Sequence, residues 1–403
     1  MISEYSIQKK LHIALIFSGD EEIGGGFQQQ LTTILELKQL NNYKFTVFVF
    51  SKENIAKLQV HNIKPIFIKE KYLEKVFRYL LRQNWAYYFV EKYKIMSPFE
   101  KILIKNNIDL AYFLSPNGLS LDLVKINYIT TVWDLSHRDT PEFPEGYAFR
   151  IFEQREILYN KSLIKSIAII TDSNRGKINI IRRYGVDENR VYPVSFLPSE
   201  DTNNTNSIDV KKKYNINCNY IYYPSQFWSH KNHIYIIDAI SFLKKENIEI
   251  AAVFSGSDQG NLNYVLEYAN KIGVSDQIKY IGFVPGEDIY SLYKHSLALV
   301  MPTYFGPTNI PPLEAFSIGV PVIYSDLPDL REQVDDAALL CDLNKPESLP
   351  NNMKSLLQSD NLSSSLIKKG QHRLKELQQI DITKVAEKIF DGYAIKMKSW
   401  KNY

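Results

Sequence analysis

This chain has little cysteine, no long apolar run and no large excess of either charge. Its 403 residues include two cysteines, Cys218 and Cys341, too few for a disulfide framework or a four-thiolate zinc site. No apolar run approaches the roughly 18 residues that a membrane-spanning helix needs. The first residues lack the basic-then-apolar pattern of a secretion signal. We therefore expect a cytoplasmic protein, able to lie on the inner face of a membrane but not to cross it.

The charge balance excludes another class of partner. The chain has 48 basic and 45 acidic residues, a net charge of +3 at pH 7, whereas nucleic-acid binders carry a concentrated basic excess. The acidic residues are scattered and form no Asp-x-Asp metal clamp. We expect no nucleic acid, no metal and no cofactor. A length of 403 residues with 45% hydrophobic residues is typical of a globular protein of two domains.

Short β-branched and aromatic runs alternate with helical patterns along the chain. Several runs are continuously apolar, as in parallel strands covered on both faces. Such alternation predicts an α/β protein with parallel sheets and right-handed crossovers. The predicted strands begin at Leu11, Lys44, Lys64, Ile108, Asn127, Ser166 and Arg190, and then at Asn219, Glu249, Gln277, Leu297, Val320 and Ala337.

A polar stretch without periodicity, Leu197–Asp209, interrupts this alternation. It predicts Rossmann-like, doubly wound domains at residues 1–198 and 213–384, a linker at 199–212 and a final helix within 385–403. Two such domains facing each other would form a cleft between the carboxyl ends of their sheets, where ligands bind.

The segment Met301–Asp326 carries the strongest local signal. Pro311 and Pro312 open a predicted helix that ends at Gly319, after a strand and a polar loop. The amides near Asn309 and Ile310 would have no acceptor within that helix, so a diphosphate there would gain hydrogen bonds and the helix dipole. Glu314 would lie close enough to accept from a ribose diol, or it is only a first-turn acid favoured by the dipole.

The letters NIPPLEAFSIGVPVI in this segment resemble the donor-site signature of retaining glycosyltransferases of family 4, which have the GT-B fold. Glu314 matches the second Glu of the family's Glu-x7-Glu motif, which typically contacts the donor ribose. The first Glu is replaced by Gly306, which suggests a subgroup lacking the usual sugar contact. Thr308 and Asn309 are candidates for supplying a polar contact instead.

The resemblance continues upstream, in YPSQFWSHKNH. Lys231 matches a family lysine, and Gln226 stands where an arginine is common. Negative charge builds on a departing diphosphate, so fixed positive charge is needed there. The resemblance thus implies that Lys231 contacts the donor, unless it is a solvated lysine at a helix start. Val284 is either a neighbour of the nucleotide base or part of a simple strand-to-helix turn.

Two segments of the first half also resemble the family. Gly24, Gly25 and Gly26 follow the first predicted strand and precede a helix, so their amides could reach the donor phosphate; a glycine cluster alone is a weak signal. In TTVWDLSHRD, Asp134 and His137 resemble the family's sugar and acceptor contacts. Either residue could instead cap a turn or helix.

The sequence therefore predicts a hexosyltransferase-type enzyme that uses Lys231, Glu314 and Asp134. By resemblance, residues 1–198 would bind the acceptor, residues 213–384 the nucleoside-diphosphate sugar, and the last helix would return to the first domain. The product would retain its configuration, the acceptor would be a saccharide or a lipid-linked saccharide, and the pathway would be surface polysaccharide synthesis. The aromatic and basic segment Glu74–Lys94 could touch a membrane, or be a partly buried helix pair. A sugar-nucleotide epimerase or hydrolase and a non-catalytic binding protein remain alternatives.

Overall fold

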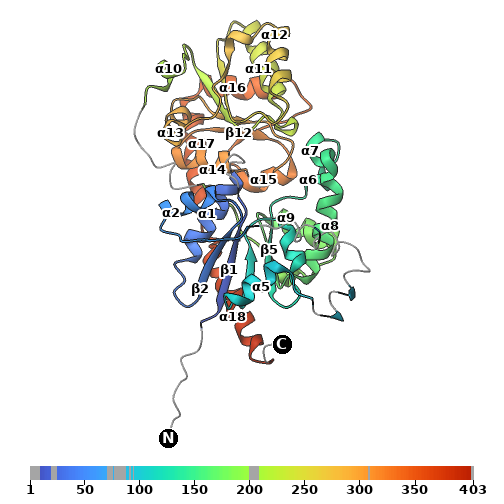
Figure 1. Cartoon of the computed structure of the whole chain (residues 1–403). Coiled ribbons are helices and arrows are strands. Elements are labelled where there is room, and N and C mark those ends of the chain that lie inside the picture. Colours follow the sequence, from blue (N-terminus) through green and yellow to red (C-terminus); the bar gives the residue numbers. More distant parts are fainter. Residues whose placement is uncertain are drawn as a thin grey trace. The chain divides into compact units, whose positions relative to one another are not determined.

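The chain forms two compact units, each with its own parallel sheet and core. Unit 1 comprises residues 1–135, 152–194 and 380–403, and unit 2 comprises residues 136–151 and 195–379. The computed structural model describes residues 10–19, 25–69, 76, 88–89, 92–93, 95–198, 208–306 and 309–400. Each unit is described below by itself (Figure 1).

Unit 1 is built on a seven-stranded sheet of order β3-β2-β1-β4-β5-β6-β7, in which every paired strand is parallel. All six residues of β1 are buried, as expected for a central strand covered on both faces. The strands are β1 His12–Phe17, β2 Lys44–Val49, β3 Ile66–Phe67, β4 Leu110–Phe113, β5 Asn127–Val132, β6 Ala168–Thr171 and β7 Val191–Pro193.

Unit 2 repeats this architecture with a six-stranded sheet of order β10-β9-β8-β11-β12-β13, again parallel at every pair. The strands are β8 Tyr220–Pro224, β9 Ala251–Ser255, β10 Ile278–Tyr280, β11 Leu299–Met301, β12 Val322–Ser325 and β13 Leu339–Cys341. In both sheets the strand order reverses beside the first strand, the arrangement of doubly wound folds. The predicted fold class of two Rossmann-like domains is thus confirmed.

Local sequence signals explain where several helices begin and end. In α9, the Ser173 side chain accepts a hydrogen bond from the Gly176 amide, and Gly185 closes the helix at a φ of 63°. In α14, Asn309 is the N-cap, prolines occupy the first turn, and Gly319 closes the helix at a φ of 80°. Helix α14 thus begins and ends within one residue of the positions that Pro311 and Gly319 predict.

The helices of the two units are as follows. In unit 1 they are α1 Gly25–Leu37, α2 Glu53–Val60, α5 Pro98–Lys105, α8 Ile151–Lys165, α9 Asn174–Tyr184 and α18 Ile382–Met397. In unit 2 they are α6 Ser136–Asp139, α7 Pro144–Tyr147, α10 Val210–Lys213, α11 His233–Lys245, α12 Leu262–Lys271, α13 Gly286–Lys294, α14 Ile310–Ile318, α15 Pro328–Val334, α16 Ser348–Gln358 and α17 Asp360–Leu377.

Two segments belong to a unit from which they are distant in the sequence. The last helix, α18, lies with unit 1 (Figure 1). There Tyr43 Oη donates to Asp391 at 2.6 Å, and the Phe390 ring is fully buried. Residues 136–151, named the strap below, belong to unit 2. We expected residues 1–198 to form one continuous domain. The strap departs from this expectation, because its contacts are made with residues much further along the chain.

Some predicted features lie outside the described residues: Gly24, Thr308, most of the 199–212 linker and most of Glu74–Lys94. Among the helices that the structure does describe, none has the length and apolar character needed to traverse a bilayer.

Candidate functional site

The start of α14 is organised by the side chain and backbone of Asn309. Its amide Nδ2 donates to the Gly306 carbonyl and to Tyr324 Oη, each at 2.6 Å. The Gln333 side chain makes two hydrogen bonds with the Asn309 backbone: it accepts from Asn309 N at 3.3 Å and donates to Asn309 O at 2.5 Å. Asn309 is therefore rigidly held before the helix begins.

This arrangement changes which amides are available to a ligand. The sequence predicts free amides near Asn309 and Ile310, but the Asn309 N–H already has a side-chain acceptor in Gln333. Pro311 and Pro312 carry no N–H at all. Ile310, the first residue of α14, is thus the backbone donor best placed for an anion at this helix end.

Lys231 lies at this same helix start. Its Nζ atom donates to Asn309 Oδ1 at 3.0 Å, across a sequence separation of 78 residues. The Lys231 carbonyl accepts from Tyr223 Oη at 2.9 Å, and Tyr223 is fully buried on β8. The structure therefore brings together Lys231, Asn309 and Ile310 within unit 2.

Glu314 lies one turn into α14 and is half-buried. Its Oε2 accepts a hydrogen bond from Tyr293 Oη at 2.8 Å. Burial raises the pKa of this carboxyl group, and the hydrogen bond from Tyr293 opposes the shift only in part. A bond from a buried tyrosine orients Glu314, so it is more than a solvated first-turn acid.

The backbone of Gly306 has a geometry that a larger residue would tolerate poorly. Its φ is +111°, and a Cβ atom there would lie 2.7 Å from Asn309 Oδ1. A glutamate at this position would be strained and would collide with Asn309. The residue at position 306 and the side chain of Asn309 are thus sterically linked.

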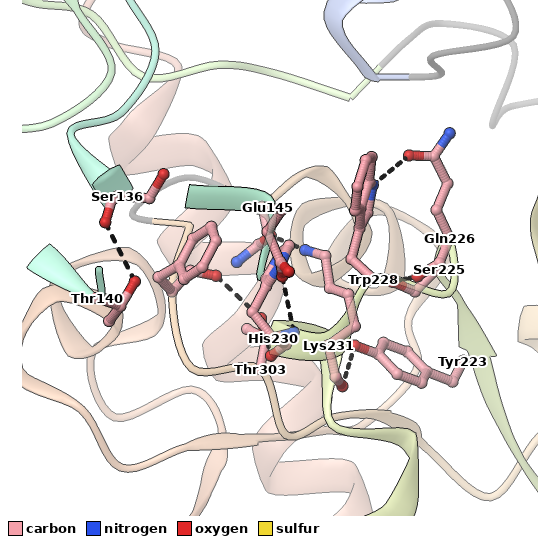
Figure 2. A network of polar contacts seen from close by, with 12 residues as sticks. Ser136, Thr140, Glu145, Tyr223, Ser225, Gln226, Trp228, His230, Lys231 and Thr303 are labelled. Carbon is pink, nitrogen blue, oxygen red and sulfur yellow. Dashed lines mark hydrogen bonds and ion pairs between the residues drawn. The ribbon is translucent and has the colours of Figure 1, made fainter. Parts of the chain in front are cut away.

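Two other predicted donor contacts lie in unit 2. Gln226 follows β8, where its Nε2 donates to Ser257 Oγ at 3.1 Å and its Oε1 accepts from Trp228 Nε1 at 3.0 Å. Figure 2 shows Gln226 and Trp228 paired beside Lys231. Val284 is buried after β10, which is compatible with its alternative role as part of a strand-to-helix turn.

The strap contributes a carboxylate that the sequence analysis did not single out. Glu145 Oε1 accepts from the backbone N–H of His230 at 2.9 Å and also contacts His230 Nδ1 (Figure 2). Burial alone would raise the pKa of Glu145, but the bonds from His230 outweigh it and hold that pKa below its ordinary value. The His230 ring stacks on Phe305, with 3.7 Å between centroids.

Of the predicted glycines of unit 1, Gly25 and Gly26 open α1. A Cβ atom on Gly26 would lie 2.7 Å from Trp133 Cη2. This close approach gives Gly26 a packing role, whatever its amide binds.

Asp134 and His137 have surroundings that only the tertiary structure defines. Asp134 Oδ1 accepts from the Arg155 guanidinium at 2.7 Å. Burial would lower the pKa of Arg155, but Asp134 outweighs it and raises that pKa. His137 lies in α6 and is fully buried.

A cavity of about 340 Å³ lies in unit 1 next to this ion pair. Trp133 and Arg155 line it, together with the buried Tyr159. Apolar walls complete it: Pro116, Leu121, Ile157 and Leu158. Flat aromatic faces beside hydrogen-bonding groups suit a ligand with both apolar and polar surfaces.

Sequence reasoning missed Glu145, His230, Tyr293 and Arg155. His230 directly precedes Lys231 in the sequence, and this position was a signal that could have identified it. The other three residues lie in no local motif. Within the part of the chain that the structure describes, no group of three or more His, Cys, Asp or Glu residues could hold a metal ion.

Comparison with known proteins adds independent findings. Residues 206–373, all in unit 2, match the family described as glycosyl transferases group 1. The O-antigen chain mannosyltransferase B of Escherichia coli is 27% identical over 256 residues, 62% of this chain and 66% of that protein. The O-antigen chain mannosyltransferase RfbU of Salmonella typhimurium (strain LT2) is 23% identical over 220 residues, 54% of this chain and 58% of that protein.

Among solved structures, Anabaena Alr3699/HepE in complex with UDP-glucose is similar over 95% of this chain and 99% of its own. The TM-score is 0.70 at 15% sequence identity, a likeness of fold. The curated relatives named above are matched over less than two thirds of their own length. The family match in unit 2, these relatives and the shared fold are the findings on which the functional proposal below is based.

Proposed function

We propose that this chain is a retaining glycosyltransferase of family 4, moving a sugar from a nucleoside-diphosphate sugar to a saccharide or lipid-linked acceptor. The observation that carries the proposal is the bond from Lys231 Nζ to Asn309 Oδ1, 3.0 Å long, at the start of α14. Surface polysaccharide synthesis is the proposed setting, because two relatives are named O-antigen chain mannosyltransferases. A lipid-linked acceptor would bring the protein to a membrane surface.

In this proposal unit 2 binds the donor. The diphosphate accepts from the Ile310 amide and pairs with Lys231, which stabilises the negative charge that develops as the sugar departs. Glu314 accepts from the ribose hydroxyls through Oε1, while Tyr293 holds its Oε2. Val284 and Gln226 are assigned to the surroundings of the nucleotide. The structural relative in complex with UDP-glucose supports a nucleotide-sugar donor.

Asn309 takes the place of the family's first Glu in our proposal. Its Oδ1 lies where a side chain on Gly306 would project, 2.7 Å from a Cβ atom built there. A neutral amide oxygen at this point can accept from a sugar hydroxyl and still receive the bond from Lys231, because a carbonyl oxygen has two lone pairs. This exchange would preserve the sugar contact without a second carboxylate.

We assign the acceptor to unit 1. The cavity of about 340 Å³ beside Trp133 and Arg155 has room for one sugar ring or more. Asp134, held by Arg155, remains the proposed acceptor contact of this unit. His137, buried in the strap of unit 2, remains a separate proposal for a sugar contact.

The test begins with nucleotide binding. Thermal unfolding is followed with UDP, GDP and their sugars, since a ligand of the native state raises the melting temperature. The sugar that stabilises the protein is then incubated with candidate acceptors, and the anomeric configuration of the product is read by NMR. An inverted product would refute retention, and free sugar or an epimer formed without acceptor would favour the hydrolase or epimerase alternative. Binding without transfer to any acceptor would favour a non-catalytic protein.

A further inference from the structure

The loop that carries Lys231 is held by a carboxylate from a distant part of the chain. Glu145 of the strap lies 85 residues before His230, and its Oε1 accepts from the His230 backbone N–H at 2.9 Å. Both side chains are largely buried, with exposed fractions of 11% for Glu145 and 9% for His230. Water therefore competes poorly for these bonds.

The other backbone groups around His230 and Lys231 are held by residues outside the strap. The His230 carbonyl accepts from Tyr304 N at 2.9 Å, and the Lys231 N–H donates to the Trp228 carbonyl at 3.1 Å. The Lys231 carbonyl accepts from Tyr223 Oη. Among these hydrogen-bond partners of the His230 and Lys231 backbone, Glu145 is the one that the strap supplies (Figure 2).

The His230 side chain adds a second attachment. Its ring stacks on Phe305 at an interplanar angle of 16° and packs edge-on against Phe143 of the strap, 6.3 Å away between centroids. Phe143 also contacts Tyr304, at 5.2 Å between centroids. The strap thus clamps the short 3-10 helix Ser229–Lys231 through both polar and aromatic contacts.

We propose that Glu145 is a positioning residue for the donor site: by holding the His230 N–H and imidazole, it keeps Lys231 at Asn309. The proposal rests on the proposed function, because it assumes that Lys231 binds the donor diphosphate. The physical reason is that Lys231 has four rotatable side-chain bonds, so the placement of its ammonium group depends on a rigid backbone.

The experiment compares E145A, E145Q and E142A by calorimetric titration with UDP and with GDP. E145A should weaken binding of the nucleotide that the wild type prefers by about tenfold or more. E145Q should restore most of that affinity, because its amide oxygen still accepts from the His230 N–H. E142A, an exposed acid in the same strap, is the matched control and should bind as the wild type does.

A double-variant cycle separates positioning from simple stabilisation. If Glu145 acts through Lys231, then E145A should add less than about twofold to the loss already caused by K231A. Additive losses, wild-type affinity in E145A, or an E145Q variant no better than E145A would overturn the proposal.

The crystal structure of E145A, or of E145Q if E145A does not fold, provides a readout without ligand. We expect Lys231 Nζ to leave Asn309 in E145A and to stay in E145Q; an unmoved Lys231 in E145A, or a displaced one in E145Q, would overturn the positioning role. Absence of UDP and GDP binding in the wild type would instead count against the proposed function, and the crystal structures would still decide the role of Glu145.

Discussion

Lys231 is the residue at which loss of charge should affect turnover far more than folding. Replacing Lys231 with Ala removes the cation proposed to stabilise the leaving diphosphate, so we expect turnover to fall about 10²- to 10³-fold, or about 3–4 kcal/mol. The free energy of unfolding should fall by only about 1 kcal/mol, since the variant loses one side-chain hydrogen bond, from Nζ to Asn309 Oδ1. Steady-state assays and thermal unfolding measure the two effects. Lys245→Ala, at the exposed end of α11, is the control, and wild-type turnover in Lys231→Ala would remove this residue from the mechanism.

His233, two residues further on, should make the protein sensitive to acid. Burial, helped by the charges of Lys231 and His230, lowers the pKa of His233 to about 3. Its ring stacks on Phe227 at 4.2 Å, and neither ring nitrogen has a hydrogen-bond partner among the described residues. The folded state therefore favours neutral His233, and this stability is present above the unfolded pKa near 6.5 and is lost as the pH falls below it.

We expect the free energy of unfolding to fall by about 2 kcal/mol between pH 7 and pH 5 because of His233. His233→Phe, an aromatic ring that cannot be protonated, should abolish this part of the loss in urea titrations at the two pH values. His372→Gln, which replaces a histidine with 76% of its side chain exposed, should keep it. Equal acid sensitivity in His233→Phe and the wild type would contradict the assignment.

At the scale of an element, α1 is positioned by the absence of a side chain at Gly26. Alanine would favour the helix by about 1 kcal/mol, but its Cβ would lie 2.7 Å from Trp133 Cη2. We expect Gly26→Ala to lower the free energy of unfolding by about 1–3 kcal/mol, the usual cost of overpacking. Adding Trp133→Phe should recover this loss in denaturant titrations.

The control for this prediction is Gly392→Ala in α18, where an added Cβ meets nothing within 4 Å. That substitution should stabilise the protein by up to about 1 kcal/mol. If Gly26→Ala also proved stabilising, the packing role would be wrong. If the double variant regained stability but not nucleotide binding, the Gly26 backbone would have a role in the donor site as well.

At the scale of the whole molecule, the last helix of the chain completes the first unit. Phe390 of α18 is fully buried and lies 5.0 Å from the Tyr43 ring between centroids. Phe390→Ala should destabilise unit 1 by about 3–5 kcal/mol, the usual effect of a large cavity. Hydrogen exchange should then accelerate in the unit 1 strands, while nucleotide binding by the native protein persists.

Ile395→Ala on the same helix is the control, because Ile395 is 65% exposed and should change stability by less than about 0.5 kcal/mol. If Phe390→Ala accelerated exchange in the strands of unit 2 rather than unit 1, our assignment of α18 to unit 1 would be wrong.

Much of the fold could be predicted from the sequence because its signals are local. Continuous apolar runs mark buried parallel strands such as β1 and β8, and Ser173, Gly185, Pro311 and Gly319 mark helix ends within a few residues of themselves. Short motifs likewise single out Lys231, Asn309 and Glu314 as candidate site residues. A periodicity or a capping residue acts over one or two turns, so a single sequence is enough to read it.

The tertiary structure alone decided the partners of those residues. Nothing near Glu145 indicates that it binds His230, 85 residues away, and nothing near Asp134 indicates Arg155. Gln333 takes the Asn309 amide that the sequence leaves free. These contacts depend on which crossovers place which loops side by side, a long-range property of packing that local patterns do not encode. Local patterns therefore specify the strands and the helix ends, whereas long-range packing specifies which groups hold Lys231 at Asn309.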